Sequence, residues 1–231
     1  MGIAEITPGI SGATIAGLFN VYKDFVNFLN VFNPFKIKPN LSYFYKEINF
    51  SFIIPLVLGM VISIYLSALA IDYFRKSYLY ELKIFLSAVM FIAVIKNCGL
   101  DQSLNDSFKY ILDFILGFLI AIVIALSLVE LDFNNSFLLV LAGLLAFTAF
   151  LLPGISGSLV LVILGVYGSI TTAIKDIDVI FLMPFIIGMA ISFLIIPSQI
   201  IKRINDNEVK AKVFFSGLIL GSIPAVWLYL I

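Results

Sequence analysis

The chain has 231 residues, of which 62% are hydrophobic and 12% are charged, and its mean hydropathy is +1.14. A soluble domain is about 45–50% apolar and about 25% charged, so a water-soluble enzyme is excluded, and the balance of 14 basic and 14 acidic residues gives no surplus for binding nucleic acid. The chain has no histidine and a single cysteine, Cys98, so we expect no disulfide, no metal site, no cofactor and no enzymatic activity.

Five segments are apolar enough to cross a bilayer as helices, which takes about 20 mostly apolar residues. They cover residues 51–73, 82–97, 108–129, 179–201 and 213–231. Residues 33–50 are more polar and rich in aromatic side chains, which predicts a loop at the membrane interface. The chain is therefore expected to be an all-α polytopic membrane protein with a single transmembrane domain.

Two further segments are interrupted by the same pentapeptide, PGISG. It begins at Pro8 in the first segment, residues 1–28, and at Pro153 in the second, residues 137–174. Proline removes a backbone hydrogen bond and glycine permits unusual backbone angles. Each segment is therefore predicted to form a re-entrant hairpin of two half-helices that meet at the break.

The two pentapeptides belong to an internal repeat. Seven of 15 positions are identical between residues 8–22 and 153–167, at an offset of 145, and six of 12 between 52–63 and 181–192, at an offset of 129. We expect repeat one at 1–98, a linking span at 99–135 and repeat two at 136–231. Three crossings between the breaks would invert the second copy, a plan that recurs in transporters.

Basic residues are distributed unevenly between the two sides of this arrangement. One side holds nine, namely Lys36, Lys38, Lys46, Lys96, Lys109, Lys202, Arg203, Lys210 and Lys212. The other holds four, namely Arg75, Lys76, Lys83 and Lys175. The positive-inside rule predicts that the first side is cytoplasmic.

The breaks have the chemistry of an anion site. The first N–H groups of the half-helix after each break lack helical partners and carry the positive end of the helix dipole, which favours phosphate. The other interpretation is a kink with small residues for close packing. The candidate phosphate-binding residues are Gly9, Ser11, Gly12, Thr14, Gly154, Ser156, Gly157 and Ser158.

These motifs resemble those of the bacterial polyprenyl-phosphate transporter family (PopT-type). The resemblance rests on GIAEITPGISGATIAGLFNVY, from Gly2 to Tyr22, and on the PGISGS block that starts at Pro153, and it extends over essentially the whole chain. Two positions depart from the family pattern, because Ala13 and Asn20 stand where glycine is usual. The resemblance implies a multi-pass protein of the inner, cytoplasmic membrane that translocates undecaprenyl phosphate for recycling in envelope synthesis.

Several other side chains are candidates for roles in transport. Glu5 lies in an apolar setting before the first break and is either a proton or charge relay or a surface residue at a helix end. Lys83 and Lys212 occupy equivalent repeat positions, as do Tyr22 and Tyr167, and these four could bind a headgroup or form a gate, although interfacial snorkelling also explains them. Asp113 is expected to pair with Lys109.

Two other functions use the same features. A transporter of a small soluble anion would employ the same helix ends, and a membrane lipid phosphatase would act on the same cargo. The phosphatase is disfavoured because the chain has no histidine and no clustered aspartates for metal. The partners expected are a polyprenyl phosphate lipid, the bilayer and a coupling proton or cation, without nucleic acid.

Overall fold

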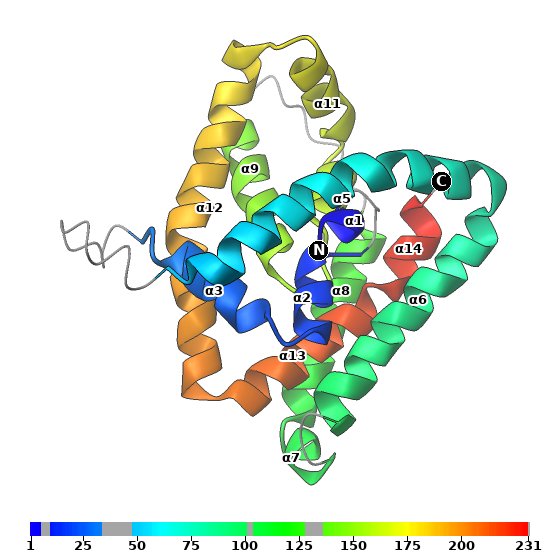
Figure 1. Ribbon diagram of the computed structural model, residues 1–231, viewed down its shortest axis with the longest axis vertical. Helices are drawn as coiled ribbons and strands as arrows, with labels where there is room; N and C mark the ends of the chain where they lie inside the picture. Colours follow the sequence, from blue (N-terminus) through cyan, green and yellow to red (C-terminus); the bar gives the residue numbers. More distant parts are fainter. Residues whose placement is uncertain (6–9, 34–47, 101–103, 128–135, 231) are drawn as a thin grey trace.

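The computed structural model describes residues 1–5, 10–33, 48–100, 104–127 and 136–230, and the regular structure in these ranges is helical (Figure 1). A short π-helical turn, Lys96–Leu100, follows α6. The helices are α1 (Gly2–Glu5), α2 (Gly12–Leu18), α3 (Tyr22–Asn30), α5 (Phe50–Ser77), α6 (Leu79–Ile95), α7 (Leu104–Lys109), α8 (Ile111–Leu126), α9 (Ser136–Leu151), α10 (Gly157–Ile163), α11 (Tyr167–Lys175), α12 (Val179–Asp206), α13 (Glu208–Gly221) and α14 (Ile223–Tyr229).

The outer surfaces of these helices are apolar, which is the pattern of a chain that lies in lipid. Leu112 on α8 is 77% exposed and Ile180 on α12 is 87% exposed. Within the described residues, α12 and the segment Glu208–Tyr229 are long and apolar enough to cross a bilayer, and the pair α10 and α11, bent by 114°, gives a third candidate.

The predicted spans correspond to helices, but several of these helices are short. Residues 179–201 lie in α12, and residues 213–231 overlap α13 and α14. The predicted spans at 82–97 and 108–129 become α6 and α8, with 17 and 16 residues, which is less than the roughly 20 that a straight crossing needs. The described apolar part of α5 is Phe50–Ser63. Most of the predicted interfacial loop, 33–50, lies outside the described residues.

The sequence repeat reappears in the helix boundaries. At the offset of 145, α2 corresponds to α10 and α3 to α11, with the same first and last positions. At the offset of 129, α5 corresponds to α12 in the same way, and α6 and α13 begin at equivalent residues. Asn20 and Gly165 are also equivalent, and both have positive φ, 59° and 76°. The asparagine therefore adopts the left-handed conformation that its glycine counterpart adopts.

Two helix pairs pack closely through glycines and form the frame of the molecule. In the pair α9 and α12, a Cβ on Gly143 or Gly188 would come within 2.0 Å of a carbonyl oxygen of the partner helix. In the pair α8 and α13, a Cβ on Gly117 or Gly217 would come within 2.3 Å. Close backbone approach of this kind is how small residues hold helices together in membranes.

The hairpin predicted at 137–174 has three helical pieces instead of two. The break at PGISG separates α9 from α10, and a second bend at Leu164–Val166 separates α10 from α11. The reason is local, because Gly165 has a φ of 76° and ends α10 two turns after it begins. Figure 1 shows α5 crossing the bundle obliquely, while α6 and α13 begin at opposite ends of the molecule.

Candidate functional site

At the first break, side chains of the protein bind the N–H groups that begin α2. Ser11 caps the helix, and its Oγ accepts the N–H of Ala13 at 3.1 Å. The Oε1 atom of Glu5 accepts the N–H of Gly12 at 2.6 Å. The carboxylate of Glu5 thus occupies the position at which the sequence predicts a bound anion. Pro8 and Gly9 lie outside the described residues.

The second break is shaped by close backbone packing. Gly154 has a φ of +98°, and a Cβ there would lie 2.6 Å from the backbone nitrogen of Ile219 on α13. A Cβ on Gly157 would lie 2.7 Å from the carbonyl oxygen of Ala146 on α9. Ser156 is fully buried and makes no cap, because its hydroxyl bonds to that of Ser158 at 2.7 Å. Both glycines are therefore required by the packing of the break.

The two breaks meet in the interior. The Oγ1 atom of Thr14, which is fully buried, accepts the N–H of Gly154 at 2.8 Å. The hydroxyl of Tyr22 donates to the carbonyl oxygen of Leu151 at 2.8 Å, at the end of α9 where the break leaves that carbonyl without a helical partner. Two residues of the first repeat thus satisfy two backbone groups of the second.

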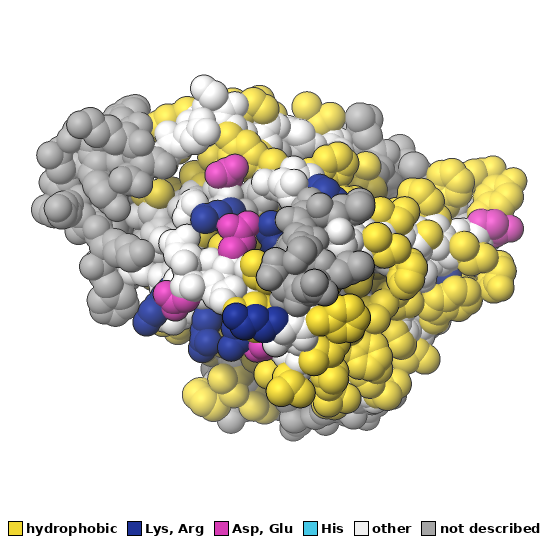
Figure 2. Space-filling view, turned by 90° about the horizontal axis from the view of Figure 1, so that it is seen from below, with side chains coloured by type: hydrophobic (Ala, Val, Ile, Leu, Met, Phe, Trp, Pro, Cys, Tyr) yellow, Lys and Arg dark blue, Asp and Glu magenta, His cyan; other side chains and the backbone are white. Residues whose placement is uncertain are grey.

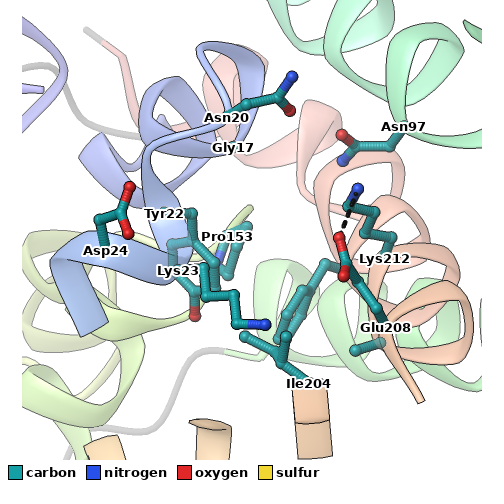
Figure 3. Close-up of a pocket in the computed structure, with 12 residues that line it drawn as sticks. Gly17, Asn20, Tyr22, Lys23, Asp24, Asn97, Pro153, Ile204, Glu208 and Lys212 are labelled. Carbon is teal, nitrogen blue, oxygen red and sulfur yellow. Dashed lines mark ion pairs between the residues drawn. The ribbon is translucent and has the colours of Figure 1, made fainter. Parts of the chain in front are cut away.

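A pocket of about 380 Å³ opens beside the second break (Figure 3). In Figure 3, Asn20 and Lys23 approach from the side of α2 and α3, and Asn97 and Lys212 approach from the facing side. The lining residues are Gly17, Asn20, Tyr22, Lys23, Asp24, Asn97, Pro153, Ile204, Glu208, Ala211, Lys212 and Phe215. The pocket therefore combines two ammonium groups and two side-chain amides above a floor that includes Pro153.

The cations of the pocket are balanced by carboxylates. The ammonium group of Lys212 lies 2.9 Å from Oε1 of Glu208, and this pair is partly exposed. Asp24 lines the pocket together with Lys23. Figure 2 shows that Lys and Arg side chains gather on this face, with Asp and Glu side chains among them, at the end of the molecule where α7 and the turn between α12 and α13 lie. An anion entering the pocket would compete with Glu208 for Lys212.

A second cavity, of about 520 Å³, lies on the other side of α13. It shares Ala211 and Phe215 with the first, and Leu152 of the break lines it. Phe215, which lines both cavities, makes an edge-to-face contact with Tyr22, and the two ring centroids are 5.6 Å apart. Half of the twelve residues that line this cavity are polar or charged, Arg203 among them, and the other half are apolar.

The remaining predicted residues lie elsewhere. Lys83 donates a hydrogen bond to the carbonyl oxygen of Trp227 at 3.0 Å, and Tyr167 is 44% exposed at the start of α11. Of the nine basic residues assigned to one side, Lys36, Lys38 and Lys46 lie outside the described residues. Asp113 was expected to pair with Lys109, but its carboxylate lies 3.4 Å from Lys210, because the close packing of α8 and α13 brings that ammonium within reach.

Sequence reasoning did not identify several polar residues of the pocket, including Glu208, Asn97 and Lys23. Glu208 stands four residues before Lys212, a spacing that is a recognisable signal for an ion pair on a helix. Asn97 belongs to the π-helical turn after α6, and Lys23 lies in the first turn of α3. No local pattern indicates that these residues share a cavity with Pro153.

Comparisons with known proteins address the identity of the chain directly. No solved structure matches it. The polyprenyl-phosphate transporter of Vibrio cholerae serotype O1 is 31% identical over 236 residues, which cover 98% of this chain and 74% of that protein. The model of the VCA0040-like family, described as undecaprenyl phosphate translocase-like, matches residues 1–230. The chain therefore belongs to this family of undecaprenyl phosphate translocase-like membrane proteins.

Proposed function

We propose that this protein transports polyprenyl phosphate, undecaprenyl phosphate in particular, across the bacterial cytoplasmic membrane, so that the carrier lipid can be reused in envelope synthesis. Family membership and the name of the Vibrio relative support this cargo. The observation that carries the proposal is the pocket at the second break, which faces the basic end of the molecule and presents Lys23 and Lys212. A transporter has no need of a catalytic group, and we assign none.

We place the phosphate headgroup in this pocket first. A phosphate is a stronger acceptor for an ammonium than a neutral group, and the amides of Asn20 and Asn97 can donate to its remaining oxygens. The carboxylate of Glu208 is the competitor that the headgroup displaces from Lys212. Tyr22 lines the pocket and is fixed by its bond to the carbonyl of Leu151. We propose Tyr22 as a gate residue, together with its repeat counterpart Tyr167.

The residues of the two breaks then bind the headgroup as it passes between the repeats. In the present arrangement, their polar groups are bound to one another, as in the contacts of Thr14 with Gly154, Ser156 with Ser158 and Glu5 with Gly12. Separation of the breaks would free the N–H of Gly154 from Thr14, and the headgroup would displace the acceptors within each break. The residues in this role are Gly9, Ser11, Gly12, Thr14, Gly154, Ser156, Gly157 and Ser158. Glu5, next to the freed N–H of Gly12, would carry the coupling proton.

The isoprenoid tail remains in lipid while the headgroup moves. Exposed apolar side chains on α8 and α12 provide a surface compatible with such a tail. The apolar residues of the second cavity, such as Leu116, Leu152 and Phe214, can contact the first isoprene units. A polar pocket beside a cavity with apolar lining residues and a lipid-compatible outer surface favours a lipid phosphate over a small soluble anion or a phosphatase substrate.

Two inverted repeats give the transport path its geometry. We assign repeat one to 1–98, the linking span to 99–135 and repeat two to 136–231, with each repeat a re-entrant hairpin followed by two spanning helices. The coinciding helix boundaries and the opposite starting ends of α6 and α13 support this arrangement. The basic residues around the pocket support an opening on the cytoplasmic side, and we assign the chain a multi-pass topology in the inner membrane.

Competition binding tests the proposed cargo and pocket together. Purified protein would be titrated with labelled undecaprenyl phosphate against inorganic phosphate and against undecaprenol. We expect the lipid phosphate to bind far more tightly than either competitor. Lys212→Gln removes a charged hydrogen bond of about 1.5–3 kcal/mol and is expected to weaken binding about 10- to 100-fold. Lys202→Gln, on the exposed surface of α12 outside both cavities, is the matched control.

Inorganic phosphate competing as effectively as the lipid would contradict the cargo and favour the soluble-anion transporter. Equal affinities for Lys212→Gln and Lys202→Gln would contradict the pocket while leaving the cargo open to another site. Release of inorganic phosphate from the lipid by the purified protein would favour the phosphatase.

A further inference from the structure

A cluster of four side chains joins α6 to α14 near the C-terminus, away from the end where the pocket opens (Figure 1). Lys83 donates to the carbonyl oxygen of Trp227 at 3.0 Å, and its ammonium lies 5.9 Å from the centre of the indole ring. The indole N–H of Trp227 donates to Oγ of Ser87 at 3.1 Å. Tyr80 packs against the indole at a ring-centroid distance of 5.6 Å, with the planes at 80°. Trp227 is thus held by contacts with three residues, although it is 40% exposed.

Lys83 is the repeat counterpart of the pocket residue Lys212. The two lysines are 129 residues apart, which is the offset that relates α5 to α12. Each is followed four positions later by a serine whose hydroxyl donates to the lysine carbonyl at 2.8 Å, Ser87 to Lys83 and Ser216 to Lys212. The local structure around both lysines is therefore the same, while α6 and α13 begin at opposite ends of the molecule.

In each copy, the lysine is bound by an acceptor from the protein itself. Lys212 is paired with the carboxylate of Glu208, beside an open pocket. Lys83 is bound to a backbone carbonyl in the last turn of α14, and the indole ring lies beside it. The difference between the two copies is that an aromatic side chain occupies the space next to Lys83, where the pocket is next to Lys212.

We propose that Lys83 is a second binding site for a lipid phosphate headgroup, on the face opposite the pocket, and that Trp227 is the latch that closes this site in the present conformation. This inference rests on the proposed function. A phosphate bears full negative charge and is a stronger acceptor for the ammonium than the carbonyl of Trp227. A headgroup that arrives from the opposite face displaces that carbonyl, and the indole swings away from Ser87.

An ordinary helix cap accounts for only one of these contacts. Lysine side chains commonly bond the last carbonyls of a helix, and the bond from Lys83 to the carbonyl of Trp227 is of that kind. A cap requires neither an indole ring beside the ammonium nor an indole N–H bound to the serine that follows the lysine. Because the ring is partly exposed, it can leave without opening the buried core.

The single tryptophan of the chain makes the latch directly observable. Purified protein in nanodiscs, where both faces are open to solution, would be titrated with undecaprenyl phosphate or with undecaprenol, while Trp227 emission and its quenching by acrylamide are recorded. The phosphate lipid should shift the emission and raise the quenching, and the alcohol should do neither. In Lys83→Gln, the quenching should be raised before lipid is added and should not respond further.

Ser87→Ala gives a second test that does not depend on Lys83→Gln folding. It removes one neutral hydrogen bond, worth about 0.5–1.5 kcal/mol, from the closed latch, so the tryptophan response should occur at about 2- to 10-fold lower concentration of undecaprenyl phosphate. Ser198→Ala, at a partly exposed position of α12 where the hydroxyl bonds to the carbonyl of Ile195 in the same helix, is the matched control and should respond as the wild type does.

Three results would overturn the latch. They are an equal response to undecaprenol, an undiminished response in Lys83→Gln, and a response of Ser87→Ala at the same concentration as the control. Wild-type protein that binds undecaprenyl phosphate in the competition assay without any change at Trp227 would refute the latch and leave the proposed function standing. Absence of binding in that assay would refute the proposed function as well.

Discussion

The contact between the two breaks can be tested by removing one hydroxyl. Thr14→Val replaces the Oγ1 atom that accepts the N–H of Gly154 at 2.8 Å by a methyl group of similar size. Thr14 is fully buried, so water cannot replace the lost acceptor, and the N–H of Gly154 is left without a partner. An unsatisfied buried donor costs about 1–3 kcal/mol, a substantial part of a typical net stability of about 5–15 kcal/mol.

The assay is thermal unfolding of the purified protein in detergent, followed by the fluorescence of its one tryptophan. Thr171→Val is the matched control, because the hydroxyl of Thr171 lies on an exposed helix face and bonds only to carbonyls of its own helix. Thr14→Val should lower the apparent Tm by several degrees, and Thr171→Val should leave it nearly unchanged. Equal Tm values for the two variants would refute the claim that this bond joins the repeats.

Three further predictions concern the pocket and the breaks. Tyr22→Phe keeps the ring against Phe215 but leaves the carbonyl of Leu151 without its donor. It should lower the free energy of unfolding by about 1–2 kcal/mol in the same assay. An unchanged Tm would show that the carbonyl has another donor. Glu208→Gln frees Lys212 from a partly exposed ion pair worth about 0.2–1 kcal/mol. Undecaprenyl phosphate should therefore bind about 1.5- to 5-fold more tightly to this variant. Weaker binding would show that the carboxylate assists the headgroup. Glu5→Gln retains an oxygen that can accept the N–H of Gly12 but cannot carry a proton. The variant should therefore fold, and its transport rate should no longer depend on pH. A pH dependence of transport like that of the wild type would exclude Glu5 as the relay.

The local structure of the repeats was predictable because it depends on short-range signals. PGISG marks a helix break in both copies, since proline and glycine disrupt helices wherever they occur. The equivalence of Asn20 and Gly165 follows from the alignment of the repeats, and both adopt positive φ because asparagine tolerates that region better than most residues. Helix boundaries could therefore be transferred from one copy to the other.

The composition of the pocket was not predictable, because it depends on tertiary packing. Thr14 and Gly154 are 140 residues apart, and no local pattern indicates that they are bonded. Asp113 illustrates the same limit, since helical spacing favours Lys109 as its partner, whereas the packing of α8 against α13 brings in Lys210. The sequence indicated groups with the chemistry to bind an anion, but not that the protein's own carboxylates, Glu5 and Glu208, already occupy two of them.

Transport in liposomes tests the central claim most directly. Purified protein would be reconstituted into vesicles that contain labelled undecaprenyl phosphate in both leaflets, and a membrane-impermeant phosphatase would report how fast lipid from the inner leaflet reaches the outside. We predict that the protein makes the inner pool accessible much faster than empty vesicles do, and that Lys212→Gln loses most of this acceleration while Lys202→Gln keeps it. A rate equal to that of empty vesicles with folded wild-type protein would contradict the account.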